Sequence, residues 1–151
     1  MVKLFHGGVQ NQVINMTSNI NINLGAGELG KGFYAGLSYG LSKSWAYHKT
    51  QKFNIKNNSS ENYAILKIEF PKISYKGYVH YLSRIQTIDI VNALRFAKLT
   101  KTCSFGVDAI CGQIVGNHKY RSMENGYLQV KFEGNYSESF LNSQAFIKVI
   151  K

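Results

Sequence analysis

The sequence is poor in proline, in acidic residues and in long apolar runs. Its 151 residues include one proline, Pro71, and only eight acidic residues, against 18 basic ones. A single proline among 14 glycines favours regular elements separated by glycine turns. No apolar run reaches the length that crosses a bilayer, and no signal peptide precedes the first apolar segment. We therefore expect a cytoplasmic protein with no membrane partner.

The positive charge indicates which classes of partner the protein favours, and the cysteines indicate the redox compartment. A formal net charge of +10 favours anionic partners, such as a phosphate-bearing cofactor, a nucleic acid or an acidic protein. The lysines are spread along the chain, so the charge alone does not choose among these classes. Cys103 and Cys111 fit buried free thiols in a reducing compartment, and a disulfide between them stays open. The four histidines lack metal-ligand spacing, so we predict no metal site.

The length and apolar content predict one folded domain over residues 1–151. With 44% hydrophobic and 13% aromatic residues, the chain is too apolar to be disordered. The order of the expected elements predicts an α+β fold with mostly antiparallel pairing. We expect strands at 2–6, 63–70, 107–115, 127–132 and 145–150, a weaker strand within 72–81, helices at 42–53 and 85–99, and polar loops at 118–126 and 134–143.

Residues 30–47 form the stretch around which the chain is organised. The segment is rich in glycine at its start, and glycines such as Gly32 let a backbone approach a ligand closely. Tyr34 and Tyr47 offer flat faces to a flat ring. A helix with Ser42 as N-cap would direct free backbone N–H groups to the same place. The simpler interpretation is a turn that leads into a core helix, with both tyrosines half-buried.

For residues 30–47 alone, the turn that leads into a core helix is the preferred interpretation. A second motif, Leu4-Phe5-His6-Gly7, changes the preference to a ligand-binding segment, because this motif lies where a first strand is expected to end. Together with Gly-Lys-Gly-Phe-Tyr at 30–34 and Ser-Lys-Ser-Trp-Ala-Tyr at 42–47, it resembles the NAD-binding core of diphtheria-toxin-like ADP-ribosyltransferases. This class includes the poly(ADP-ribose) polymerases. The run Val-Asp-Ala-Ile-Cys-Gly at 107–112 is similar to small bacterial ADP-ribosyltransferase-like domains of unassigned target. The resemblance implies two small, mostly antiparallel sheets packed around an NAD cleft with flanking helices.

The resemblance also implies how these residues would hold NAD. His6 would hydrogen-bond the adenosine-side ribose, and the Gly7 backbone would pair with the nicotinamide carboxamide. Ser44 would offer its hydroxyl to the same amide. Tyr34 and Tyr47 would sandwich the nicotinamide ring, whose positive charge favours cation–π contact. A core histidine satisfied by the backbone is the simpler interpretation of His6.

The chain departs from the family pattern at its last strand. The family has a glutamate there, which stabilises the oxocarbenium-like transition state, and the matching residue in this chain is Gln144. The implied catalytic set is therefore His6, Tyr34 and Gln144. A neutral amide can hold a ribose hydroxyl but cannot offset the growing positive charge, a loss of about a hundredfold or more in rate. Three explanations stay open: a natural variant, an inactivating change, or a carboxylate from Glu133 or Glu138 in the preceding loop.

The resemblance implies an NAD-dependent ADP-ribosyltransferase that releases nicotinamide, with a bacterial toxin or effector role and an antitoxin partner. Its macromolecular acceptor would be nucleic acid or protein, and Lys119, Arg121 and Lys131 near the 134–143 loop fit nucleic acid. One alternative is a catalytically weak module that binds NAD or ADP-ribose. Another is a basic nucleic-acid-binding domain whose glycine loop contacts phosphates. This last alternative ranks lowest, because the sequence shows no interleaved basic–aromatic sheet motif.

Overall fold

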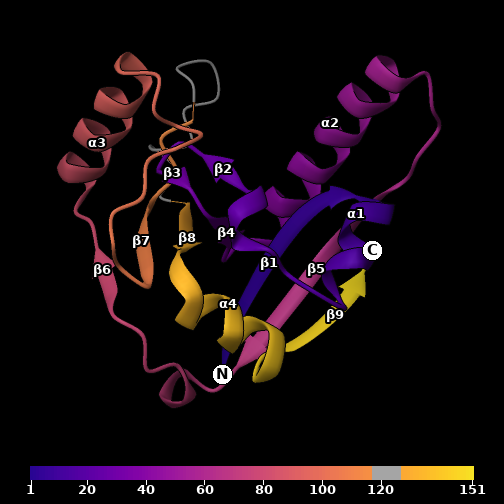
Figure 1. The fold of residues 1–151 in the computed structure, drawn as a ribbon. Helices are drawn as coiled ribbons and strands as arrows, with labels where there is room; N and C mark the ends of the chain where they lie inside the picture. The colour runs from indigo at the N-terminus through magenta and orange to yellow at the C-terminus, as the bar shows by residue number, and fades with distance from the viewer. Residues whose placement is uncertain (117–126) are drawn as a thin grey trace. The chain divides into compact units, whose positions relative to one another are not determined.

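A computed structural model describes residues 1–116 and 127–151 and confirms the α+β class (Figure 1). The expected loop at 118–126, with Lys119 and Arg121, lies outside the described residues. The helices are α1 (Gln10–Met16), α2 (Tyr39–Asn57), α3 (Arg84–Phe96) and α4 (Gly134–Ser143). The strands are β1 (Val2–Val9), β2 (Ala26–Gly27), β3 (Gly30–Lys31), β4 (Phe33–Gly36), β5 (Tyr63–Phe70), β6 (Val79–Tyr81), β7 (Ala109–Gln113), β8 (Leu128–Phe132) and β9 (Phe146–Ile150).

The chain divides into two compact units, and each is described by itself. The first unit comprises Met1–Ile20, Gly36–Tyr75 and Leu141–Lys151, and the second comprises Asn21–Ala35 and Lys76–Phe140. The expectation of a single domain, and that of the specific ADP-ribosyltransferase fold, stay predictions.

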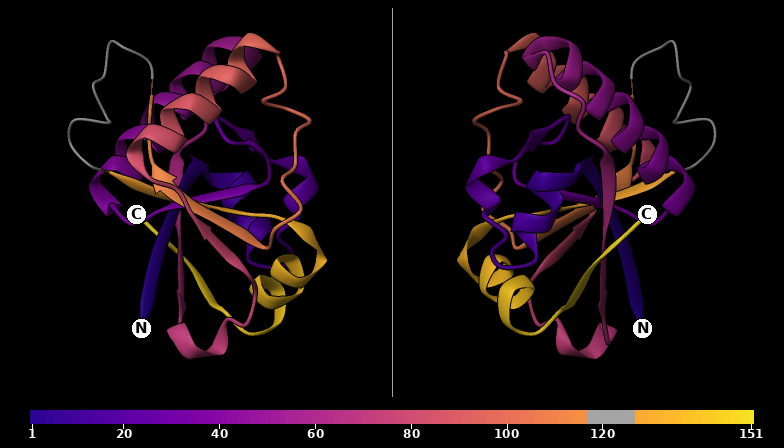
Figure 2. Two further views of the ribbon diagram at one scale, coloured as in Figure 1. Left: turned by 90° about the vertical axis from the view of Figure 1, so that its left-hand side faces the viewer. Right: turned by 90° about the vertical axis from the view of Figure 1, so that its right-hand side faces the viewer.

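The first unit is built on an antiparallel sheet in the order β1-β5-β9, the indigo, pink and yellow strands of Figure 2. The central strand β5 has the predicted bounds, and five of its apolar side chains are buried. Helix α2 packs against one face of β1 at Gly7. Helix α1 packs against the other face, where Val13 lies next to Gly8. The sheet therefore has a helix on each face at the same end.

The second unit contains a mixed sheet in the order β6-β7-β8-β4. Strand β6 runs parallel to β7, and β7 runs antiparallel to β8. A small ladder of β2 with β3 lies in the same unit. Helix α3 begins with a capping box between Ser83 and Gln86, which satisfies free N–H groups at its start. The core of the second unit contains a buried cluster of Leu29, Val91 and Ile110.

Two predicted boundaries are wrong. Strand β1 continues through Gly7 and Gly8, which remain in register with β5, so the glycine pair does not end it. Helix α2 begins at Tyr39, and its N-cap is Ser38, whose hydroxyl accepts a hydrogen bond from the Leu41 N–H at 3.1 Å. Ser42 therefore lies inside the helix and is not its cap.

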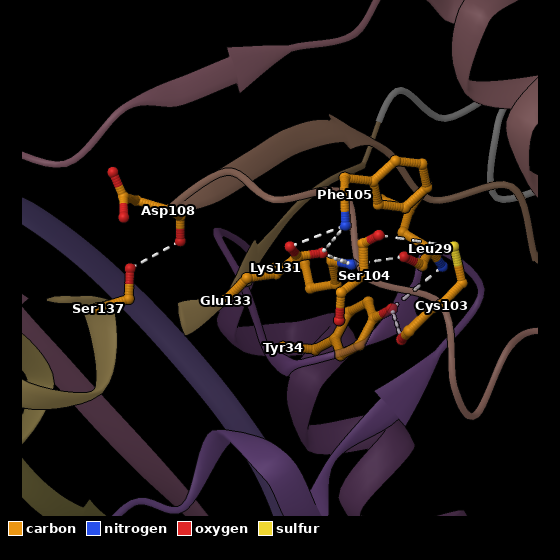
Figure 3. Close-up of polar contacts among 10 residues, drawn as sticks. Leu29, Tyr34, Cys103, Ser104, Phe105, Asp108, Lys131, Glu133 and Ser137 are labelled. Atoms are coloured by element: carbon orange, nitrogen blue, oxygen red, sulfur yellow. Dashed lines mark hydrogen bonds and ion pairs between the residues drawn. The ribbon is translucent and has the colours of Figure 1, made fainter. Parts of the chain in front are cut away.

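The polar loop expected at 134–143 is helix α4. Its sequence has weak helix formers, but Ser137, Phe140 and Leu141 are almost fully buried. Spacings of three and four residues place these side chains on one helical face. The Ser137 hydroxyl also donates to the Asp108 carbonyl at 2.6 Å, as Figure 3 shows. Tertiary packing therefore overrides the low intrinsic propensity.

Candidate functional site

Residues 4–7 and 42–47, two of the three motifs, contact each other in the first unit. A Cβ atom at Gly7 would lie 2.8 Å from the Ala46 Cβ and would overlap the Ser42 carbonyl oxygen. Glycine is therefore required for helix α2 to approach strand β1 this closely. The Ser42 hydroxyl adds a hydrogen bond to the Phe5 carbonyl at 3.3 Å. Gly36, the last residue of β4, pairs with the same Phe5.

His6 lies on the sheet face opposite to the one that α2 covers. It pairs with Leu66, and Leu66 pairs with Val149, so these three side chains share a face. Gly7 is the next residue and points to the other face, because side chains alternate along a strand. The imidazole is half-buried. His6 and Gly7 are therefore adjacent in the backbone but present different faces of the sheet.

Tyr47 and Ser44 lie on helix α2, away from the His6 side chain. The Tyr47 ring packs edge-on against Tyr63, with 6.3 Å between ring centroids, and 49% of the residue is exposed. Tyr63 belongs to the same sheet face as Gly7, so Tyr47 lies on the α2 side. Ser44 is exposed, about half a helical turn from the buried Ala46. Of these helix residues, Ser42 is the one whose hydroxyl reaches β1.

Gln144 is exposed in the turn between α4 and β9. The two carboxylates considered as substitutes for it are both hydrogen-bonded within the second unit. Glu133 accepts from the Phe105 N–H at 3.0 and 3.1 Å, and Glu138 accepts from the Ile22 N–H at 2.9 Å. Glu138 lies on helix α4, and Glu133 directly precedes that helix, so neither is part of a loop at 134–143.

Tyr34, in the second unit, fixes the tight turn between β2 and β3. Its hydroxyl accepts a hydrogen bond from the Leu29 N–H at 3.1 Å and donates one to the Gly30 carbonyl. A Cβ at Gly27 would lie 2.7 Å from the Tyr34 Cζ, so this glycine packs directly on the ring. Burial raises the pKa of Tyr34 well above the ordinary tyrosine value. The phenol is therefore neutral and oriented, with one ring face against Gly27.

Gly32, the other predicted site residue of this unit, makes room for a buried lysine. A Cβ at Gly32 would lie 2.7 Å from the Lys131 Cγ. The Lys131 ammonium donates to the Leu29 carbonyl at 2.7 Å, forms an ion pair with Glu133 and lies 4.7 Å from the centroid of the Phe105 ring (Figure 3). Burial lowers the pKa of Lys131, and the Glu133 carboxylate opposes that shift.

Sequence reasoning missed this ion pair because strand β8 buries polar side chains that its alternating pattern would place in solvent. Its alternation predicts a half-exposed strand with polar side chains in solvent. In the structure Gln129 and Lys131 are buried, whereas Leu128 is partly exposed. Alternation shows that a strand has two faces but does not tell which one is buried.

A second, largely buried carboxylate, Glu28, organises the end of the same sheet. It accepts hydrogen bonds from the N–H groups of Val115 at 2.6 Å and Gly116 at 3.0 Å, and from the Gln129 amide at 2.7 Å. Arg95 forms an ion pair with it at 3.2 Å. These contacts make Glu28 a structural residue.

Comparison of the chain with known protein families gives no match, and neither does comparison with curated proteins. Within residues 1–116 and 127–151, no three His, Cys, Asp or Glu side chains are grouped so that they could hold a metal ion. None of the helices in the described part of the chain has the length and apolar content needed to cross a bilayer. Cys103 and Cys111 are free, half-buried thiols.

Proposed function

We propose that the protein is an NAD-dependent ADP-ribosyltransferase that transfers ADP-ribose from NAD to a macromolecular acceptor, nucleic acid or protein. The observation that supports the proposal is the packing of residues 4–7 against residues 42–47 at Gly7. These motifs are about 35 residues apart in the chain, and both belong to the resemblance. Their contact packs the interior of strand β1 directly against helix α2 at Ser42 and Ala46, so the two segments lie together in one unit.

In the proposed reaction the bond between the nicotinamide nitrogen and the ribose C1′ breaks, and nicotinamide leaves as a neutral molecule. A nucleophile on the acceptor forms the new bond to C1′, and its proton passes to solvent. Gly7, Ser44 and Tyr47, on the side of the first sheet that α2 covers, would contact the dinucleotide, and the roles that the resemblance implies for His6, Tyr34 and Gly32 stay predictions. Gln144 would hold a ribose hydroxyl without contributing negative charge.

The test is nicotinamide release from labelled NAD in the presence of a mixed cell extract. We expect slow release by the wild type and faster release by Gln144→Glu, by about a hundredfold or more, because a carboxylate would stabilise the developing cation. Gln51→Glu, on the exposed side of α2, is the matched control, since it makes the same change in charge. Absence of release from both the wild type and Gln144→Glu would contradict the proposed function.

A second candidate is a module of the same kind that binds NAD or ADP-ribose without turnover. It is favoured by the contacts of Glu133 and Glu138, whose carboxylates already accept backbone N–H groups, and by the neutral Gln144. Calorimetry separates the two candidates. Tight NAD binding without nicotinamide release, in the wild type and in Gln144→Glu, would favour the binding module.

A further inference from the structure

The first unit carries most of the positive charge. It contains nine lysines, no arginine and two glutamates, Glu61 and Glu69, which amounts to +7 of the formal +10. The remaining +3 belongs to the second unit, which has six acidic residues. About half of the chain therefore carries more than two thirds of the excess positive charge. The sheet of the first unit, β1-β5-β9, carries three of its lysines.

The register of the first sheet gathers lysines and phenylalanines on one face. Residues directly opposite each other in antiparallel strands share a face, and residues two apart on one strand do so as well. One row across the three strands is therefore Lys3, Glu69 and Phe146. The adjacent row is Phe5, Lys67 and Lys148. We call these six side chains the lysine–phenylalanine face.

Helix α2 covers one end of this face and leaves the rest accessible. The next row is at Gly7, where α2 packs. Tyr39, at the start of the helix, contacts the edge of the Phe5 ring, with 5.6 Å between centroids. Beyond that point Phe146 is 77% exposed, and Lys3 and Lys148 are exposed. An aromatic ring and two ammonium groups are thus presented to solvent on the same face of the sheet.

The charges on this face are not balanced. Its one carboxylate, Glu69, forms an ion pair with the Lys67 ammonium at 2.8 Å. Lys67, with Lys3 and Lys148 farther away, lowers the pKa of Glu69, so all three lysines act on the same carboxylate. Lys67 also lies directly opposite Lys148, and like charges in that position destabilise a sheet. An anion bound here would relieve that repulsion.

We propose that the lysine–phenylalanine face binds single-stranded nucleic acid, with the lysines contacting phosphates and Phe146 stacking on a base. Lysine is a point charge that suits phosphate oxygens and carries no sequence preference. Aromatic side chains add stacking, which requires bases that are not already stacked in a duplex. Adjacent rows lie about 7 Å apart and the three strands span about 10 Å, so the footprint is small. This surface does not depend on the proposed NAD chemistry.

The test is fluorescence anisotropy of the full chain with labelled oligothymidine and oligouridine. We expect dissociation constants between about 1 and 100 μM, and a slope of log affinity against log salt of about −2 for three phosphate contacts. Equal binding of both probes would indicate single strands in general, and a preference for one would distinguish DNA from RNA. Duplex DNA of the same length should bind more weakly, because its bases are not available to Phe146.

Matched variants separate this face from the overall charge. The double variant Lys3→Gln with Lys148→Gln should reduce the slope of log affinity against log salt by about 1.4. The control is Lys52→Gln with Lys56→Gln, which makes the same charge change on exposed residues of the far part of α2 and should leave most of the slope unchanged. Phe146→Ala should weaken binding about tenfold. Phe96→Ala, which removes an equally exposed ring in the second unit, should not.

Glu69→Gln provides a test in the opposite direction. Loss of the one carboxylate on the face should tighten binding several-fold, a gain that misfolding cannot produce. The proposal would be overturned if the variants on the face behaved like their controls, if duplex bound as tightly as single strand, or if anionic phospholipid vesicles bound while the oligonucleotides did not.

Discussion

The two units handle charge in opposite ways. In the second unit, Lys131 with Glu133 and Arg95 with Glu28 are paired at buried or largely buried carboxylates, which also accept backbone N–H groups. In the first unit, nine lysines share two glutamates, and the sheet gathers three of these lysines around one carboxylate, with Lys3 and Lys148 exposed and Lys67 partly buried. Paired, buried charges maintain a fold, whereas exposed, uncompensated charges are available to a partner. The second unit thus holds its charges in pairs, whereas the first unit presents an excess of positive charge to solvent.

The largest expected effect tests the buried pair. Glu133→Gln keeps an acceptor for the Phe105 N–H but leaves the Lys131 ammonium buried without its counter-charge, and we expect a loss of about 3–5 kcal/mol in the free energy of unfolding. The additional change Lys131→Met should recover most of it. Urea unfolding measures both. The first-unit counterpart, Glu69→Gln, should move the unfolding midpoint far less, and equal losses would contradict the difference between the units.

The next effect concerns packing in the first unit. Gly7→Ala places a methyl group against the backbone of α2, and we expect a loss of about 2–3 kcal/mol from overpacking. Gly40→Ala is the control, because nothing lies within 4 Å of its added Cβ. In a helix, that change should stabilise by about 0.5–1 kcal/mol. Thermal unfolding should therefore give opposite signs, and a harmless Gly7→Ala would contradict the contact between the two motifs.

The Tyr34 hydroxyl gives an intermediate effect in the second unit. Tyr34→Phe leaves the Leu29 N–H and the Gly30 carbonyl without this partner, at a cost of about 1–3 kcal/mol. The pKa of Tyr34 is raised in the folded state, so its contribution to stability is complete below the ordinary tyrosine pKa and is lost as the pH rises above it. Ultraviolet titration should therefore show one tyrosine fewer with delayed ionisation in the variant. An unchanged alkaline titration would contradict the assignment.

The smallest effect checks where α2 begins. Ser38→Ala removes the N-cap hydroxyl and should cost about 1 kcal/mol. Ser42→Ala removes a hydroxyl whose hydrogen bond to the Phe5 carbonyl is long, at 3.3 Å, and should cost less. Ser83→Ala, the cap of α3, gives a reference from the second unit. If Ser42→Ala were the more damaging change, the helix would begin where the sequence alone predicts.

The sequence predicted the elements that local patterns determine. The strand at 63–70 has the expected bounds, and the helix expected at 85–99 is present as α3, which begins at Arg84 and ends three residues earlier than predicted, at Phe96. These segments have clear apolar periodicity, so local and tertiary preferences agree. Helix α4 was not predictable in this way, since its sequence is polar and does not show that Ser137, Phe140 and Leu141 are buried.

The candidate surfaces were predictable only in part. The motif residues at 4–7 and 42–47 could be chosen from the sequence, and they meet at Gly7, but the sequence does not show that His6 faces the other side of the sheet. The lysine–phenylalanine face could not, because Lys3, Lys67 and Lys148 come from three strands more than 60 residues apart in sequence. The sequence shows no basic–aromatic motif in any one segment, and the register creates one across the strands.

The facing lysines of β5 and β9 also give the last strand a dependence on ionic strength. Lys67 and Lys148 repel each other across a ladder in which β9 has β5 as its partner in the first unit. At low salt this repulsion favours local opening of β9, and dissolved ions weaken it. Amide hydrogen exchange along Phe146–Ile150 should therefore slow as salt is added, and a bound polyanion should protect the same amides at far lower concentration.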